Sequence, residues 1–276
     1  MTTRVAYQGV PGANSEIATL GYFGEGVEPV PTPSFAALVD SVLAGQTDFG
    51  VLPIENSLAG SVIDSYDLLI DRPVFIVGEL YQHVRYQLLA LPGVKLEEVR
   101  RVYSHPQALA QSADYLRAHP ALEPEAAFDT AGAAKLVAER GLRDAAAIAP
   151  ALAGVRYGLT PLASDIQSHA ENYTRMVVLA ATEQEPKAGG VVKTSVIAGL
   201  RHEPGSLATL LSILQRAGMN LTKIESRPII GKPWEYLFYL DWEGRLEGAD
   251  LNAASAATTL WKRLGVYARG PRIEAR

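Results

Sequence analysis

The pattern of apolar runs changes near residue 181, and this change constrains the fold more than any other feature of the sequence. Before it, strand-like runs such as 49–54 and 145–150 alternate with helical stretches such as 34–45 and 131–141. Strands separated by helices favour parallel sheets that helices cover on both sides. We therefore expect the first part of the chain to form two α/β lobes with a cleft between them.

The second part of the chain follows a different order of elements. We expect strands at 193–200, 220–228, 235–244 and 266–270, and helices at 205–218 and 250–265. This order is that of the ferredoxin-like βαββαβ fold. The charged, Pro- and Gly-containing stretch 181–190 has the composition of a linker. The predicted domains are therefore 1–182 and 193–276, joined by a linker at 183–192.

The composition excludes several kinds of site and partner. The chain contains no cysteine, which excludes disulfides, thiol catalysis and thiolate metal sites. A net charge of −5 without a basic run gives no electrostatic signal for nucleic acid or a membrane surface. The sequence has no HExxH motif, no long apolar segment and no signal-peptide pattern at its start. We therefore expect a cytoplasmic protein without a metal site.

Polar residues gather where predicted strands end and helices begin. In "YQGVPGANSE", Pro11 and Gly12 turn the chain, and a helix opens near Ser15. Free N–H groups at such a helix start favour an anion, although an ordinary strand-to-helix turn has the same pattern. In "LPIENSLAG", Glu55, Asn56 and Ser57 follow an apolar strand, at the end of the sheet where α/β proteins bind ligands.

Two further helix starts have the same character. Ser104 and His105 precede a helix that Pro106 opens, and either residue could simply cap that helix. In "DTAGAAKLV", Thr130 precedes an alanine-rich helix whose small side chains allow close approach. The predicted cleft is therefore lined mainly by neutral hydrogen-bond donors.

The stretch "AENYTRMVVL" places Asn172, Thr174 and Arg175 directly before the apolar run 176–179. No histidine or carboxylate lies near enough in the sequence to activate the Thr174 hydroxyl. A site of neutral donors with one cation would suit a small polyanion that reacts readily by itself. Arg175 could bind a carboxylate of that ligand, or it could equally pair with a buried acid of the sheet.

These segments resemble, in order, the motifs of prephenate dehydratases and the similar plant arogenate dehydratases, and the later residues resemble a regulatory ACT domain. The matching segments are YQGVPGANSE, LPIENSLAGSVIDSYDLL, SHPQALAQ, DTAGAA and ENYTRM, followed by KTSV, PGSLATLL, NLTKIESRP and WEYLFYLDWEG. The resemblance implies a two-lobed catalytic domain similar to periplasmic binding proteins, followed by the ACT domain. It also implies conversion of prephenate to phenylpyruvate without a cofactor, and inhibition by phenylalanine.

The resemblance assigns roles to individual residues. It makes Thr174 the main catalytic residue, with Asn56 and Ser57 beside it. The implied substrate-binding residues are Gly12, Ser15, Glu55, Ser104, His105, Gln107, Thr130 and Arg175. The implied phenylalanine-binding residues are Gly205, Ser206, Leu207, Asn220, Glu225, Ser226 and Arg227. The resemblance also implies a homodimer or a homotetramer, as is usual in the family.

The sequence departs from the family pattern at three positions. Met176 replaces a usual phenylalanine, Asn14 a common aromatic residue, and Ser112 a frequent cysteine. Met176 is expected to alter packing behind Thr174 and to leave the chemistry intact. Asp129 and Tyr66 are closer to the arogenate branch. The alternatives are therefore an arogenate dehydratase or a non-catalytic protein that senses or binds amino acids.

Overall fold

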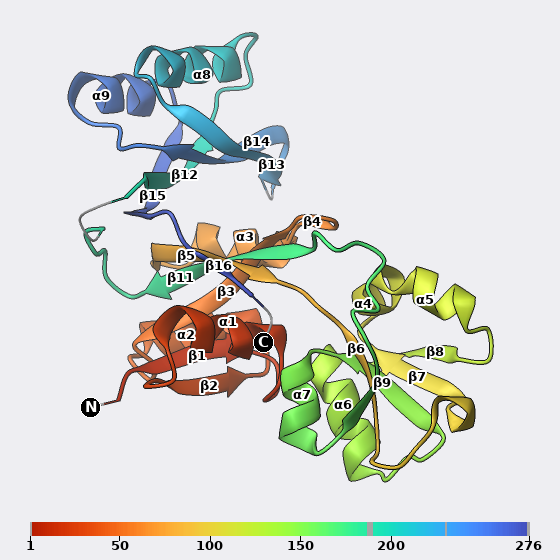
Figure 1. The fold of residues 1–276 in the computed structure, drawn as a ribbon. Helices are drawn as coiled ribbons and strands as arrows, with labels where there is room; N and C mark the ends of the chain where they lie inside the picture. Colours follow the sequence, from red (N-terminus) through yellow and green to blue (C-terminus); the bar gives the residue numbers. More distant parts are fainter. Residues whose placement is uncertain (1, 187–189, 230, 275–276) are drawn as a thin grey trace.

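The computed structural model describes residues 2–186, 190–229 and 231–274. These residues form three β-sheets with helices packed against them (Figure 1). The first two sheets come mainly from the N-terminal part of the chain, and the third comes from residues 192–268. The middle of the linker predicted at 183–192, residues 187–189, lies outside the described residues.

The first sheet has the strand order β16-β5-β11-β3-β1-β2, with β4 paired to β3. β1 is parallel to β2 and β3, whereas β11 is antiparallel to β3 and β5. Its elements are β1 (Arg4–Gln8), α1 (Asn14–Phe23), β2 (Glu28–Thr32), α2 (Phe35–Leu43), β3 (Phe49–Asn56), β4 (Gly60–Ser61), α3 (Ile63–Asp71), β5 (Phe75–His83), β11 (Tyr173–Ala180) and β16 (Arg272–Ile273). Ser34 caps α2 by accepting a hydrogen bond from the Ala37 N–H.

Strand β11 is buried on both faces, which explains its unbroken apolar run. Met176 and Val178 pack in one core cluster with Ala18 of α1, whereas Val177 and Leu179 pack in another with residues of α2, α3 and the third sheet. Successive side chains of a strand point to opposite faces. Residues 174 and 175 must therefore also face opposite sides of this sheet.

The second sheet has the order β10-β6-β9-β7-β8. Its elements are β6 (Gln87–Ala90), η1 (Leu96–Glu98), β7 (Arg101–Ser104), α4 (Pro106–Gln111), α5 (Ala113–Ala118), β8 (Glu123–Ala126), α6 (Thr130–Glu139), β9 (Ala145–Ala149), α7 (Ala151–Tyr157) and β10 (Thr160–Ser164). All of β9 is buried, and its alanines pack with the buried alanines of α6. Ser112 has a non-helical backbone between α4 and α5, so the helix that Pro106 opens ends at Gln111.

The third sheet has the antiparallel order β13-β14-β12-β15, and it has the predicted βαββαβ element order. Its elements are β12 (Val192–Gly199), α8 (Ser206–Arg216), β13 (Asn220–Ile229), β14 (Lys232–Glu243), α9 (Gly248–Ala256) and β15 (Leu260–Ala268). The predicted helix 250–265 was too long. It ends at Ala256, because Leu260 already pairs with Gly199 of β12.

The third sheet packs against the face of the first sheet that carries Val177 and Leu179 (Figure 1). Buried residues of both sheets, including Ile76, Ile197, Tyr239 and Tyr267, form one continuous core. A Cβ atom added at Gly265 of β15 would lie 2.0 Å from the carbonyl oxygen of Ile76. Only glycine allows the backbones of β15 and β5 to approach this closely.

The chain then returns to the first sheet as its final strand. Arg272 and Ile273 pair in parallel with Tyr81 and Gln82 of β5. This strand lies within the range that the sequence assigned to the C-terminal domain. The last described residues therefore join the two parts of the protein through backbone hydrogen bonds as well as side-chain packing.

Four charged side chains are buried between the first and third sheets. The Arg175 guanidinium donates to Glu79 at 2.8 Å, to Asp241 at 2.5 Å and to the Tyr267 hydroxyl at 3.1 Å. Lys193 donates to the same Glu79 oxygen at 2.9 Å. Burial alone lowers the pKa of Arg175, but the carboxylates of Asp241 and Glu79 outweigh it and raise this pKa above its usual value. The cluster thus balances two positive and two negative charges.

Replacing Arg175 by methionine is expected to destabilise the fold by about 3–5 kcal/mol, because buried carboxylates lose their cation. Denaturant unfolding of the variant measures this loss. Arg85→Met is the matched control, since Arg85 pairs with Asp165 at 2.6 Å in solvent, where such a pair contributes about 1 kcal/mol or less. Equal losses in the two variants would contradict the structural role of the buried cluster.

Candidate active site

A cavity of about 180 Å³ lies between the first two sheets, where the chain passes twice between them. It is bordered by the loop before α1, the end of β3, the starts of α4 and α6, and strand β11. Its lining residues are Gln8, Gly9, Ala13, Asn14, Ser15, Pro53, Asn56, Val84, Tyr86, His105, Gln107, Ala108, Gln111, Asp129, Thr130, Thr174 and Met176. The cavity brings together residues from both halves of the N-terminal part of the chain.

The Thr174 hydroxyl faces this cavity with its hydrogen free to donate. Asn56 Nδ2 donates to Thr174 Oγ1 at 3.1 Å, so the oxygen already accepts one hydrogen bond. Register supports this contact, because Thr174 of β11 is paired with Asn56 of β3. An accepting hydroxyl oxygen makes its own O–H a better donor. Thr174 can therefore give a hydrogen bond to a group in the cavity without a neighbouring base.

The orientation of the Asn56 amide is fixed by its other contacts. Its Oδ1 accepts from the N–H groups of Leu58 and Ala59 at 3.0 and 2.9 Å. This identifies the oxygen and leaves the Nδ2 group toward β11. There it also donates to Asn172 Oδ1 at 2.8 Å. Asn56 is thus a rigid donor that holds the Thr174 hydroxyl in place.

A network of amides continues from Asn56 across to α4. Fully buried Asn172 donates to Gln111 Oε1 at 3.0 Å, and the Tyr86 hydroxyl donates to the same oxygen at 3.3 Å. Burial raises the pKa of Tyr86 above its usual value, so Tyr86 remains a neutral donor. The sequence analysis did not assign site roles to Gln111 or Tyr86. Gln111 ends α4 and Tyr86 lies in a connection between the two sheets, at positions to which the sequence pattern assigned no role.

His105 lies at the start of α4 and acts as its cap. Its Nδ1 accepts from the Gln107 N–H at 3.2 Å, and both residues line the cavity. The helix-start role expected from the sequence is therefore observed. Ser104 lies outside the cavity: it is fully buried, and its hydroxyl donates to the Ile148 carbonyl at 2.6 Å.

The start of α1 points a helix N-terminus at the cavity. Asn14 and Ser15 line the cavity, and α1 begins without a side-chain cap. Uncapped N–H groups at this end of a ten-residue helix attract a carboxylate. Gly12 does not line the cavity. A Cβ added there would lie 2.7 Å from the Ala153 Cα, so this glycine instead allows the loop to contact α7.

Besides Ser104 and Gly12, three residues predicted for the cleft lie elsewhere. Arg175 faces the third sheet, so it has the alternative role left open by the sequence, that of a partner for buried acids. Glu55 also faces that sheet and accepts from Lys223 Nζ at 2.8 Å. Ser57 ties the end of β3 to the start of β11, because its hydroxyl accepts from the Tyr173 N–H at 2.9 Å. Glu55 and Arg175 are each next to a cavity residue on a strand, and alternation turns them away, whereas Ser57 lies just after the end of β3.

The predicted effector residues are divided among several places. Ser206 and Leu207 line a second cavity of about 160 Å³ at the start of α8, where Gly205 has a left-handed backbone. Asn220 donates to Glu243 at 3.2 Å outside this cavity. Glu225 accepts from Ser61 and Arg227 pairs with Asp67, so both contact the first sheet. Ser226, on the alternate face of β13, is exposed.

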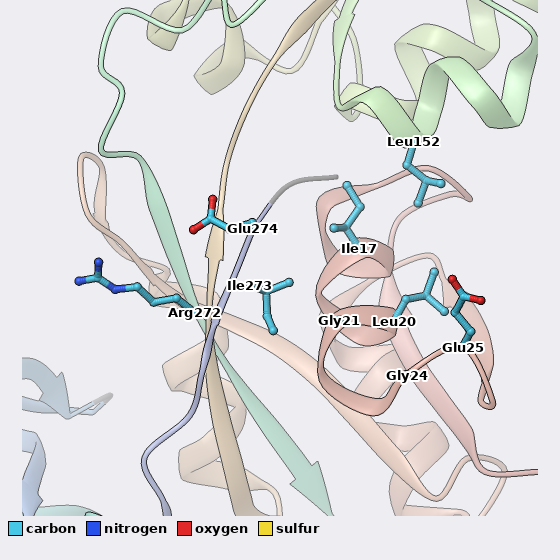
Figure 2. Close-up of a pocket in the computed structure, with 9 residues that line it drawn as sticks. All are labelled: Ile17, Leu20, Gly21, Gly24, Glu25, Leu152, Arg272, Ile273 and Glu274. Atoms are coloured by element: carbon cyan, nitrogen blue, oxygen red, sulfur yellow. The ribbon is translucent and has the colours of Figure 1, made fainter.

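A wider hollow of about 680 Å³ lies beside the C-terminal strand (Figure 2). Ile273 faces α1 there, where a Cβ added at Gly21 would lie 2.4 Å from Ile273 Cγ2. Among its lining residues, Arg272 lies over the ring of Tyr173, and Glu274 contacts the imidazole of His83. The hollow contains neither Thr174 nor Asn56, so size alone does not locate the chemistry.

The described residues contain no group of three or more metal-ligating side chains, and no described helix is long and apolar enough to cross a membrane. The cavity lining itself offers hydrogen bonding by Thr174, Asn56 and neighbouring amides, together with the field of a helix N-terminus. Such a site can bind carboxylates and donate to a departing oxygen.

Known proteins match this arrangement over most of the chain. Residues 5–184 match the family described as prephenate dehydratase. An arogenate dehydratase/prephenate dehydratase of Arabidopsis thaliana is 44% identical over 252 residues, which are 88% of this chain and 66% of the relative. A bifunctional chorismate mutase/prephenate dehydratase of Stutzerimonas stutzeri is 37% identical over 87% of this chain and 65% of its own. The chain thus spans about two thirds of the length of these relatives.

Two solved structures have folds similar to that of this chain. A prephenate dehydratase from Arthrobacter aurescens in complex with L-Phe has a TM-score of 0.87 and 29% identity, covering 97% of this chain and 90% of its own. A protein named GqqA, described as a novel type of quorum quenching acylase, has a TM-score of 0.88 and 34% identity, covering 96% and 98%. On the match of residues 5–184 and the identity to its curated relatives, this chain belongs to the prephenate dehydratase family.

Proposed function

We propose that this protein converts prephenate to phenylpyruvate, with loss of carbon dioxide and water, in phenylalanine biosynthesis. One observation carries the proposal: Thr174 faces the cavity, and its oxygen accepts from Asn56 so that its hydrogen is free. Family membership supports the same reaction. The cavity has a volume of about 180 Å³, which suits a small ligand such as prephenate.

The reaction requires little beyond binding and one hydrogen bond. The carboxylate on the ring leaves as carbon dioxide, and the electron pair of the broken C–C bond enters the ring, which becomes aromatic. The C–O bond to the ring hydroxyl breaks, and the departing hydroxide takes up a proton from the solvent and leaves as water. Thr174 donates to this oxygen as negative charge develops on it. The uncapped start of α1, with Ser15, attracts a substrate carboxylate.

Thr174→Ala is expected to reduce kcat by about 10²–10⁴-fold, because the donor to the departing oxygen is lost. Phenylpyruvate formation from prephenate measures this rate. Thr174→Ser keeps the hydroxyl and should retain most of the activity, and unfolding curves of both variants verify the fold. Near-wild-type turnover by a folded Thr174→Ala variant would refute the role of this residue.

The site supports two alternative functions less well, an acylase and a non-catalytic binding protein. Acyl transfer, the activity given for GqqA, needs a nucleophile activated by a base, but the partner of Thr174 is the Asn56 amide, which is no base. A non-catalytic binding protein remains the alternative from another class. A single rate measurement with prephenate separates that alternative from the enzyme.

We also propose that the third sheet and its helices form an ACT domain that binds phenylalanine. The cavity at the start of α8 supports this: it combines the apolar Leu207 and Phe238 with the charged Arg201 and Glu203. An amino acid has a carboxylate, an ammonium group and a side chain that these groups could bind. A relative's complex with L-Phe is consistent with such an effector.

Phenylalanine at millimolar concentration is expected to raise the melting temperature and to lower the rate with prephenate. Ligand at 100 times Kd stabilises a protein by about 2.7 kcal/mol. Leu207→Ala should weaken both effects, since Leu207 lines the cavity, whereas Val155→Ala, on the exposed face of α7, should leave them intact. The absence of any shift in the wild-type protein would count against this regulatory site.

We further propose that the protein is a homodimer or a homotetramer in the cytoplasm, and that β13 contributes to assembly. β13 is an edge strand among the described residues, and Ile224 on its outer face is 45% exposed. An exposed edge strand offers unpaired backbone groups that can pair with a second copy.

Ile224→Lys is expected to shift the assembly toward a smaller species, because a charge would enter the proposed contact. Sedimentation velocity gives the masses of the wild-type protein and the variant. Val155→Lys is the control, since Val155 is exposed on α7, far from β13 in the fold. A monomeric wild-type protein would overturn the proposal.

A further inference from the structure

The loop 9–13 joins two elements of the first sheet, β1 and α1, but it packs against the second sheet. Its Ala13 lies in the apolar core of the second sheet together with Ala153 of α7. The Tyr157 hydroxyl, also on α7, donates to the Pro11 carbonyl at 2.7 Å. The two halves of the catalytic part therefore meet at this loop, beside the cavity.

A buried carboxylate holds the loop from its other side. Glu16 lies in the first turn of α1, and its side chain is only 2% exposed. Its Oε2 accepts from the Gly12 N–H at 2.5 Å, and its Oε1 accepts from Arg156 Nη2 of α7. One carboxylate thus ties the loop to α1, and α1 to the second half of the catalytic part.

Arg156 makes a charge tolerable at this position. A buried carboxylate that lacks a cation is costly, because water would solvate its charge better. Arg156 is 44% exposed, so it reaches the buried Glu16 from the solvent side. Without Arg156, the Glu16 carboxylate would turn toward water, and the Gly12 N–H would lose its acceptor. The loop and the helix start that follows it would then leave the position that they have here.

That position matters for the cavity, because both ends of the loop line it. Gly9 does so at the start of the loop, and Ala13, Asn14 and Ser15 do so at its end. The start of α1 is also the proposed site for a substrate carboxylate. A displaced loop would therefore weaken binding. The donor to the departing oxygen belongs to another element, since Thr174 lies on β11.

We propose that Arg156 is a positioning residue for the dehydratase reaction: by balancing the charge of Glu16, it keeps the loop and the start of α1 in place to bind the substrate carboxylate. This inference rests on the proposed function and gives a role in substrate binding to a side chain outside the cavity. An unbalanced Glu16 charge would also repel that carboxylate. Both effects act on binding, so they predict a change in KM rather than in kcat.

The test measures KM and kcat for prephenate in Arg156→Met, in Glu16→Gln and in the double variant. Arg156→Met is expected to raise KM by about tenfold or more and to change kcat by less than about threefold. Glu16→Gln removes the charge and keeps an oxygen that can accept from Gly12, so its KM should stay close to that of the wild-type enzyme. The double variant should recover this KM, because it has no charge left to balance.

A KM in the double variant as high as in Arg156→Met would overturn the inference, because Arg156 would then act through the packing of its own side chain. A loss confined to kcat would overturn it as well. Arg101→Met is the matched control, since Arg101 pairs with Asp144 in solvent on the second sheet, and it should change neither constant.

Unfolding curves verify the fold of each variant. If Arg156→Met does not fold, Glu16→Gln and the double variant decide: their KM values should be equal, and a difference would refute the role of Arg156. Calorimetry of prephenate binding separates this inference from the proposed function. A wild-type protein that binds prephenate without turnover would remove the reaction, whereas the same order of affinities among the variants would keep the role of Arg156.

Discussion

The buried pairing of Arg175 with Glu79 and Asp241 is the interaction on which the arrangement of the molecule depends. A guanidinium in an apolar core is tolerated only with paired carboxylates, and one of these comes from each sheet. The pairing therefore fixes the third sheet against the first. Because Thr174 is the adjacent residue of β11, the same constraint fixes the strand that presents the hydroxyl to the cavity.

Much of the fold could be predicted from the sequence, because local patterns determine it. The apolar pattern of a strand depends on whether the strand is buried on both faces or on one. The change of pattern near residue 181 and the βαββαβ order both reflect this difference. The missed features depend on distant contacts. β16 has only two residues, and it is a strand because it pairs with β5. The end of α9 is set by the pairing of Leu260 with Gly199, which no local pattern records.

The candidate site was predictable in part, and the failures have one physical cause. Asn56, Thr174, His105 and Thr130 reach the cavity, whereas Glu55 and Arg175, next to the first two on their strands, do not. Treating polar neighbours as one group ignored the alternation of side chains along a strand. Asp129 was noted only as a likeness to the arogenate branch, since sequence cannot show that one of its oxygens caps a helix while the residue also lines a cavity.

The same alternation gives a physical route between the two parts of the protein. On β3, Glu55 accepts from Lys223 of β13, while its neighbour Asn56 donates to Thr174. On β11, Arg175 binds Asp241 of β14, while its neighbour Thr174 faces the cavity. A ligand that moved the third sheet would pull on residues 55 and 175 directly, because their partners belong to that sheet. The hydrogen bond between Asn56 and Thr174 joins the neighbours of these two residues, so its geometry would change with any such movement.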